Sequence, residues 1–117
     1  MNYFNITEFD SPDQVGSGRV MKESVLDMLD EARAKFDKAI HINSGYRTKK
    51  HNTKVGGKPN SAHLKGYAVD IHCDNSRDRY NLINCLLDVG FTRLGIAKTF
   101  IHIDADPDKD PDVVWTY

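Results

Sequence analysis

The chain has 117 residues, of which 39% are hydrophobic and 28% charged, and its net charge at pH 7 is −1. This is the length of one domain and the composition of an ordinary globular protein. No run of residues approaches the ~20 apolar positions of a membrane-spanning helix. The near-neutral charge, without a large basic block, argues against nucleic acid as the main partner. We therefore expect one domain over residues 1–117, with neither a membrane nor nucleic acid as partner.

The first third of the chain predicts an irregular arm followed by a helix. Residues 1–20 are polar and interrupted by Pro12, Gly16 and Gly18, so we expect little regular structure there. From Met21 onward, apolar residues recur at spacings of three and four, which predicts one buried helical stripe. Its members are Val25, Met28, Leu29, Ala32 and Phe36.

The middle of the chain predicts two strands on either side of a long polar loop. Residues 39–44 (AIHINS) and 67–73 (YAVDIHC) alternate apolar and polar side chains, as half-buried strands do. His41 is expected on an exposed side. Residues 46–66, between the strands, are rich in Lys, Asn, Gly and Ser. A loop of this length in so small a domain is uncommon unless it is functional.

The last third predicts a second helix and three strands. Ser76 is expected to cap a helix that runs to Val89, and Gly90 to end it. The buried face of this helix is predicted to consist of Tyr80, Ile83, Leu86 and Leu87. Strands are expected at residues 92–96 and 100–104, and a last one in VVWTY. The order of elements predicts an α+β fold, a small antiparallel sheet packed with two main helices.

The start of the chain and its cysteines bear on the compartment. The opening residues MNYFNITEFDSPD lack the basic and apolar regions of a secretory leader, so synthesis in the cytoplasm is expected. Cys73 and Cys85 lie twelve residues apart. Two cysteines do not make a disulfide framework, so we expect free thiols, with a single disulfide as the alternative.

Histidine and aspartate residues occur at three places that a fold can bring together. His63 lies at the end of the polar loop, Asp70 on the strand that follows, and His102 and Asp104 on one face of a later strand. Two imidazoles and a carboxylate form the ligand set of a catalytic zinc site, which keeps a fourth position for water. The alternative is three unrelated roles: an exposed loop histidine, a strand aspartate bonded to a turn, and a core histidine.

Several motifs, taken in order, resemble those of the zinc D-Ala-D-Ala carboxypeptidase family. The resemblance covers residues 40–117 and implies a fold of the hedgehog/DD-peptidase type with one zinc ion per chain. The closing Trp115-Thr116-Tyr117 also resembles the end of short members. The other matching motifs are Ser44-Gly45-Tyr46-Arg47, His51-Asn52, Val55-Gly56-Gly57, the run from Ser61-Ala62-His63 to Val69-Asp70, and His102-Ile103-Asp104.

The resemblance also implies roles for individual residues. The His and Asp of S-x-H-x-x-G-x-A-x-D and the His of H-x-D bind zinc in the family, which implies His63, Asp70 and His102 as ligands. Arg47 is implied as the catalytic-site residue that holds the substrate peptide, a task suited to the planar guanidinium fork. Substrate contacts are also expected from Ser61, close to the bound peptide, and from His51, in the loop that should border the cleft.

One position departs from the family pattern. Many members carry the catalytic carboxylate three residues before the last His, and this chain has Thr99 there. Asp104 is the expected substitute, either as the general base or as a group that orients His102. The sequence leaves both roles open.

The implied function is zinc-dependent hydrolysis of an amide bond in the stem peptides of bacterial peptidoglycan, by a monomer. Carboxypeptidase and endopeptidase action both stay open, as does the bond that is cut. Short leaderless members resemble phage lysis or virion-associated enzymes, which act on the cell wall after release. The alternative, favoured by Thr99, is a catalytically inactive zinc-containing module of the same fold.

The remaining polar and aromatic residues are given structural roles. His72 shares a face with Asp70 and could compete as a ligand, but a structural role is favoured. Residues 104–112 are rich in Asp like a calcium loop, yet Lys109 stands where the sixth-position glycine belongs, so we expect a solvated acidic loop. Trp115 and Tyr117 are expected to pack on the core rather than to wall the cleft.

Overall fold

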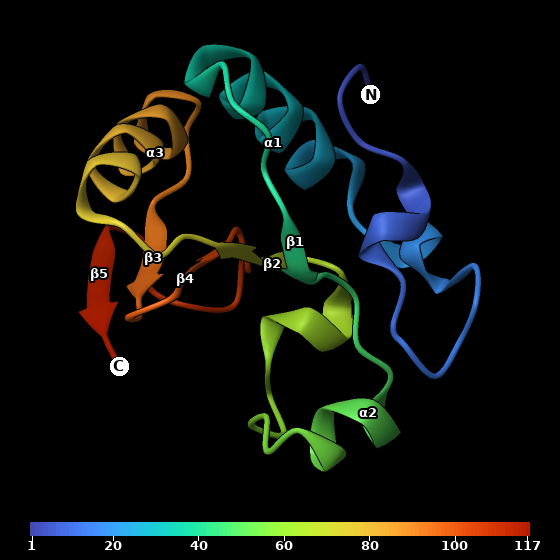
Figure 1. The fold of residues 1–117 in the computed structure, drawn as a ribbon. Helices are drawn as coiled ribbons and strands as arrows, with labels where there is room; N and C mark the ends of the chain where they lie inside the picture. Colours follow the sequence, from blue (N-terminus) through green and yellow to red (C-terminus); the bar gives the residue numbers. More distant parts are fainter.

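The computed structural model describes residues 1–117 and is built on one five-stranded sheet (Figure 1). The spatial order of the strands is β1-β2-β4-β3-β5. The bounds are Ile42–Ser44 for β1, Ala68–His72 for β2, Arg93–Ile96 for β3, Phe100–Asp104 for β4 and Val113–Thr116 for β5. The predicted α+β class is confirmed.

The sheet is mixed rather than purely antiparallel. The first four strands pair antiparallel, as predicted, but β5 runs parallel to β3. Asp104, the last residue of β4, and Val113, the first residue of β5, both lie opposite Arg93 at the start of β3. The connecting loop therefore crosses the end of β3 and delivers β5 to its free edge in the same direction. The prediction of an all-antiparallel sheet is wrong at this one pair.

Two helices, α1 (Glu23–Phe36) and α3 (Ser76–Asp88), pack together over one face of the sheet (Figure 1). Successive strand residues point to opposite faces, and the apolar ones point toward the helices. Burying a side chain of this size contributes roughly 1.5–3 kcal/mol. The fully buried strand residues on this face are Val69, Ile71, Leu94, Ile101 and Ile103. No helix in the fold is both long and apolar enough to cross a membrane.

The helices agree with the predicted bounds but not with every predicted contact. The stripe of α1 is buried at Val25, Leu29 and Ala32, with Met28 and Phe36 half-buried. In α3, Leu82 and Leu86 are buried, whereas the predicted core residues Tyr80 and Leu87 are exposed. The predicted and the observed buried residues share Leu86 and both recur at helical spacing, so packing against α1 and the sheet decides which side of α3 faces inward.

The ends of α3 are set by its flanking residues. Asn75, not Ser76, is the N-cap, and its Oδ1 accepts a hydrogen bond from the Asp78 amide at 2.9 Å. Gly90 follows the helix at φ 112°, which confirms its predicted role, because glycine adopts positive φ without a steric penalty.

The N-terminal arm consists of two short 3₁₀ turns, Ile6–Phe9 and Ser17–Val20, joined by irregular chain. Phe9 is completely buried, and its backbone approaches Gly45 so closely that a Cβ there would lie 2.8 Å from the Phe9 Cα. The Tyr46 amide donates to the Phe9 carbonyl oxygen at 2.9 Å. The arm therefore supports the segment that carries Arg47.

The long polar segment between β1 and β2 is more regular than predicted. It contains the six-residue helix α2 (Lys49–Lys54) and a 3₁₀ turn, Ala62–Lys65. The Thr48 hydroxyl oxygen caps α2 by accepting a hydrogen bond from the His51 amide at 3.1 Å. In Figure 1, α2 lies at the opposite end of the molecule from α1 and α3. We call the face of the sheet that α1 and α3 do not cover the open face.

Candidate metal site

The open face of the sheet carries a row of residues that strand register places side by side. Asp70 of β2 lies opposite His102 of β4, and His102 lies opposite Gly95 of β3. Trp115 of β5 is next in the row, opposite Gly95. Residues i and i+2 of a strand point to the same face, so Asp104 lies on the same side of β4 as His102, as predicted.

His63 reaches this row from the 3₁₀ turn. The Ser61 hydroxyl oxygen accepts a hydrogen bond from the His63 amide at 3.2 Å, and Gly66 ends the turn at φ 77°. His63 Nδ1 lies 2.7 Å from the Gly45 carbonyl oxygen, so this nitrogen carries the proton and donates. The unprotonated Nε2 then faces the Asp70 carboxylate, with Oδ1 at 3.3 Å.

His63, Asp70 and His102 each offer one ligand atom, and these atoms all lie within 4.8 Å of one another. The His102 Nδ1 is 2.9 Å from Asp70 Oδ1, and all three residues are buried. A tetrahedral zinc ion about 2.0–2.2 Å from its ligands separates them by roughly 3.3–3.6 Å. The donor set and its spacing therefore fit zinc.

Electrostatics keeps the Asp70 carboxylate ionised and therefore available to a cation. Burial raises the pKa of Asp70, but its close contacts with His102 and His63 lower it by more, so the pKa of this carboxyl is well below its ordinary value. Burial opposes the charged form of His102, yet Asp104 and Asp70 raise its pKa, so a metal ion must displace a proton from this ring. The carboxylate thus stays ionised, as metal ligation requires.

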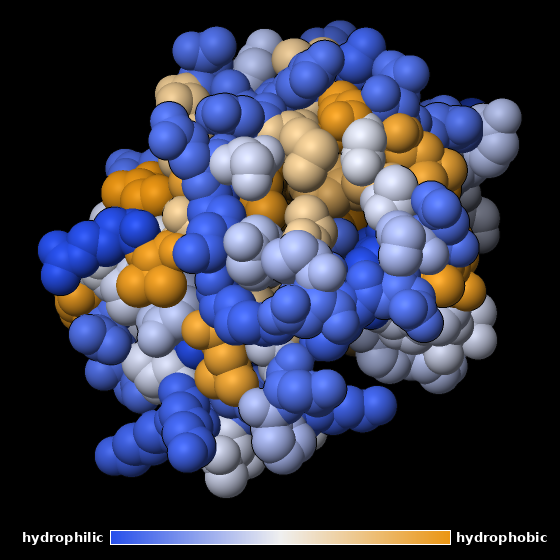
Figure 2. Space-filling view, turned by 180° about the vertical axis from the view of Figure 1, so that it is seen from behind, coloured by the Kyte–Doolittle hydropathy of each residue, from blue (hydrophilic) through white to orange (hydrophobic).

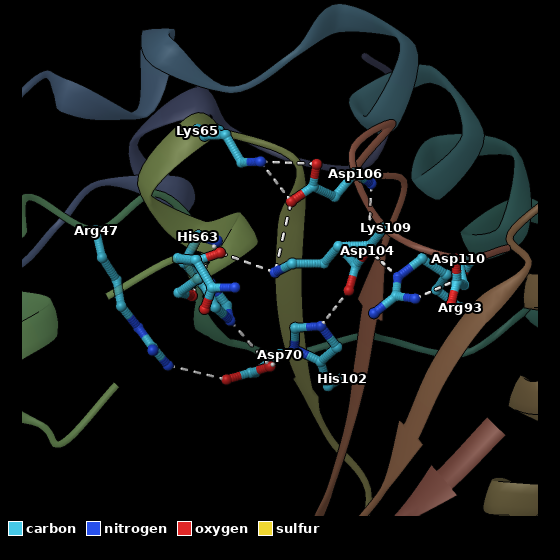
Figure 3. A network of polar contacts seen from close by, with 12 residues as sticks. Arg47, His63, Lys65, Asp70, Arg93, His102, Asp104, Asp106, Lys109 and Asp110 are labelled. Carbon is cyan, nitrogen blue, oxygen red and sulfur yellow. Dashed lines mark hydrogen bonds and ion pairs between the residues drawn. The ribbon is translucent and has the colours of Figure 1, made fainter. Parts of the chain in front are cut away.

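Asp104 lies behind His102 (Figure 3). Its Oδ2 is 2.7 Å from His102 Nε2, while its Oδ1 accepts from Arg93 Nε at 2.7 Å and from the Asp106 amide at 3.1 Å. The residue is 2% exposed. Both oxygens are therefore occupied, in the arrangement that fixes the ring orientation of a metal-binding histidine.

The Arg47 guanidinium is held beside the cluster by three acceptors from three elements. Nε donates to Ser44 Oγ at 3.0 Å, Nη2 to Asp70 Oδ2 at 3.2 Å and Nη1 to Asn52 Oδ1 at 3.3 Å. Asn52 is itself buried, and its Nδ2 donates to the Lys58 carbonyl oxygen at 2.9 Å. The role of Asn52 is not predictable from the sequence pattern, because an asparagine among lysines carries no sign that it will face inward; its only signal is its place in the His51-Asn52 motif.

A cleft of about 570 Å³ opens over the cluster. Ser61 lies on one side of it, next to the loop that follows α2, and three aromatic residues lie on the other: Phe100, Trp115 and Tyr117. Tyr117 packs on Phe100 with ring centroids 5.2 Å apart, and Trp115 packs on His102 at 5.5 Å. The prediction that Trp115 and Tyr117 pack on the core is therefore wrong.

Trp115 can occupy this position because its neighbour on β3 is Gly95. A Cβ there would lie 2.5 Å from the Trp115 Nε1, so any larger residue would displace the indole. The Arg93 guanidinium lies over the same indole, 5.2 Å from the ring centroid. The glycine, the arginine and the histidine together fix the aromatic wall.

Two residues considered for the site lie elsewhere. His51 is not among the residues that line the cleft, contrary to expectation, because α2 turns its neighbour Asn52 inward instead. Thr99 is exposed at the turn before β4 and is also outside the cleft. Asp70 and Asp104 are consequently the two carboxylates of the cleft lining, and both are paired.

The other polar residues of interest have structural or surface positions. His41 is exposed, as predicted, and His72 is exposed beside Asp74 at 3.4 Å, outside the cluster. Cys73 and Cys85 are free thiols.

The loop that follows β4 is not fully solvated, contrary to expectation. The side chain of Asp106 is completely buried, and Lys65 Nζ lies 2.7 Å from its Oδ2 (Figure 3). This pair ties the loop to the 3₁₀ turn that carries His63.

Sequence comparison agrees with the geometry. The model of the family described as peptidase M15 matches residues 2–104, which includes all three candidate ligands. No curated protein matches the chain. A match over nearly the whole chain means that the chain belongs to the peptidase M15 family of zinc D-Ala-D-Ala carboxypeptidase-type enzymes.

Proposed function

We propose that the protein is a zinc peptidase that hydrolyses an amide bond in the stem peptides of bacterial peptidoglycan. The observation that carries the proposal is the buried His63–Asp70–His102 cluster with the Arg47 guanidinium beside it. When bound, zinc polarises a carbonyl group and lowers the pKa of a water molecule toward ~7. This is the chemistry that amide hydrolysis needs.

The residues around the cluster suit a short acidic peptide. Arg47, Lys58, Arg93 and Lys109 line the cleft, against two carboxylates that are already paired. The cleft volume lies within the range of roughly 300–1,000 Å³ that is typical of small-ligand sites, which admits a few residues of extended peptide. Stem peptides are short and rich in carboxylates, so size and charge both match.

Each side chain then has a stated task in this proposal. Arg47 binds a carboxylate or carbonyl group of the peptide through the hydrogens that Ser44, Asn52 and Asp70 do not use. Ser61 contacts the peptide on the same side. Asp104 acts through His102, whose ring it orients, rather than as the general base, because both of its oxygens are occupied. The aromatic wall limits the access of bulk water.

The test is a digest of purified peptidoglycan with the protein, with and without a zinc chelator, with products identified by mass. We expect release of a defined fragment that the chelator abolishes and added zinc restores. Free D-Ala would identify a carboxypeptidase, and resolved cross-links or cut stem peptides an endopeptidase. His63→Ala, which removes one ligand, serves as the inactive control.

One observation favours a second candidate, a zinc-containing module without catalytic activity. The cleft offers no unpaired carboxylate, and Thr99 lies outside it. A protein that binds zinc at one ion per chain yet releases no fragment from any peptidoglycan type would support this second candidate.

We place the proposed activity at the bacterial cell wall, where a phage lysis or virion-associated enzyme would act.

A further inference from the structure

Charge is distributed very unevenly along the chain. Residues 38–69 contain seven Lys and Arg residues and no Asp or Glu, although the whole chain has a net charge of −1. The rest of the protein is therefore clearly acidic. The basic segment includes α2 and the loop that borders the cleft.

Four lysines of this segment have no partner within the protein. Several other lysines, among them Lys35, Lys38 and Lys109, pair with aspartates. These four lysines are exposed, and their side chains form neither an ion pair nor a hydrogen bond. We call them the lysine cluster: Lys49, Lys50, Lys54 and Lys58.

The lysine cluster is unfavourable for the helix that carries it. Lys49 and Lys50 occupy the first turn of α2, which contains no acidic residue, and positive charge at a helix N-terminus opposes the helix dipole. Lys50 and Lys54 are four residues apart, where like charges on a helix repel. Residues that destabilise their own helix without an evident compensating contact are expected at functional surfaces.

The lysine cluster faces away from the body of the protein and adjoins the cleft. At about 100° per residue, Lys49, Lys50 and Lys54 fall within an arc of roughly 140° that excludes the inward-facing Asn52. Lys58 lines the cleft itself. Strongly hydrophilic side chains project from the lower edge of the molecule, on the side where α2 lies (Figure 2).

We propose that the lysine cluster is a docking surface for the carboxylates of the peptidoglycan that surrounds the peptide held in the cleft. The inference rests on the proposed function, because it takes the same polymer as substrate. An ammonium group is a compact point charge on a flexible stem, which suits many spaced, mobile carboxylates better than one fixed anion. Such a surface raises the local concentration of an anionic substrate and speeds its association.

The test compares two variants of equal net charge. K49Q/K50Q/K54Q removes three members of the lysine cluster, none of which lines the cleft. R19Q/R77Q/K98Q removes three exposed cations that lie elsewhere in the chain. Binding is measured in the cold by co-sedimentation with purified peptidoglycan freed of phosphodiester polymers, over a range of NaCl concentrations. Cleavage of a soluble synthetic stem peptide is measured in parallel.

We expect K49Q/K50Q/K54Q to bind the polymer about ten-fold more weakly at low salt and to lose most of the salt dependence, since exposed charges contribute modestly and are screened by salt. The control variant should bind like the unmodified protein, and both should cleave the soluble peptide normally. Equal binding by the two variants, or binding only to walls that retain phosphodiester polymers, would overturn the docking proposal. If the unmodified protein bound the polymer through the lysine cluster but cleaved neither the polymer nor the soluble peptide, the proposed function would be refuted while the docking surface stood.

Discussion

At the scale of single residues, the site depends on two buried side chains that act through others. Asp104 holds His102 from behind, and Asn52 holds both Arg47 and the backbone of the cleft loop at Lys58. Each is almost fully buried, and its side chain contacts residues that line the cleft. Substituting either one should therefore alter the cleft residues without adding or removing a group that touches the substrate.

Asp104→Asn separates the two roles considered for Asp104. If the carboxylate orients His102, its loss should weaken zinc binding about 10–100-fold, as the loss of such hydrogen bonds does at other zinc sites. Zinc affinity is measured by competition with a chromogenic chelator, with the exposed Asp108→Asn as the matched control. Unchanged zinc affinity together with lost hydrolysis would show that Asp104 is the general base.

Asn52→Ala should raise KM about ten-fold for a carboxylate-bearing stem peptide and change kcat much less. The substitution removes the acceptor of Arg47 Nη1 and frees the Lys58 carbonyl group, and a hydrogen bond to a charged group contributes about 1.5–3 kcal/mol. Steady-state kinetics measures the split, and Thr53→Ala, an exposed neighbour on α2, is the control. A simultaneous loss of zinc affinity would point to general loosening and contradict this positioning role.

At the scale of elements, the cleft depends on the register between β3 and β5. That register places Trp115 opposite Gly95, so that the indole lies across the sheet surface beside His102. Arg93 of β3 lies against Asp104 of β4 and over the indole of Trp115 on β5. One edge of the sheet thus supports the aromatic wall and the ligand His102 at once.

Gly95→Ala should displace the aromatic wall while leaving the sheet intact. The new methyl group would overlap the indole of Trp115, so the ring must move toward solvent. Because Trp115 is the only tryptophan, a red shift of the intrinsic fluorescence reports the movement directly. The control is Val114→Ala on β5, next to Trp115 but on the opposite face of the sheet, which should leave the emission unchanged. An unshifted Gly95→Ala spectrum would contradict the prediction and show that the methyl group is accommodated without movement of the indole.

Features set by local sequence were predictable, and features set by contacts between distant segments were not. Strand alternation was enough to predict that His102 and Asp104 share a face, and the family resemblance implied that Asp70 joins His102 as a ligand. The position of Trp115 depends on which strand lies beside β5, and no local pattern encodes a pairing between distant segments. α2 was read as part of a loop, because six polar residues show no hydrophobic period. The buried face of α3 was predicted correctly at Leu86 but not at Tyr80 and Leu87, because the helical period alone does not fix which side of the helix faces the core.

At the scale of the whole molecule, three separate segments meet at the metal. His63 comes from the 3₁₀ turn, Asp70 from the second strand in the sheet order and His102 from the third, while the N-terminal arm supports the turn through Gly45. A bound ion would cross-link these parts and would be absent from the unfolded chain. Metal binding and global stability should therefore be coupled.

Zinc removal should lower the melting temperature by about 10 °C. A ligand at 100 times its Kd stabilises the folded state by ~2.7 kcal/mol, and a domain of this size shifts by roughly 4 °C per kcal/mol. Differential scanning calorimetry before and after dialysis against a chelator measures the change, and zinc but not magnesium should reverse it. The His63→Ala variant should melt at one temperature under both conditions; a zinc-dependent shift in this variant would place the ion elsewhere.

The parallel placement of β5 also bears on how the protein should be handled. Tyr117 packs on Phe100 at the wall of the cleft, so any residues fused after it would emerge beside the metal ligands. A polyhistidine tag attached there would bring competing imidazoles to a site that binds zinc through imidazole. The opposite terminus is safer, because the amide of Asn2 is anchored to Asp30 on α1 at 3.0 Å, far from the C-terminus in Figure 1. A purification tag therefore belongs before Met1.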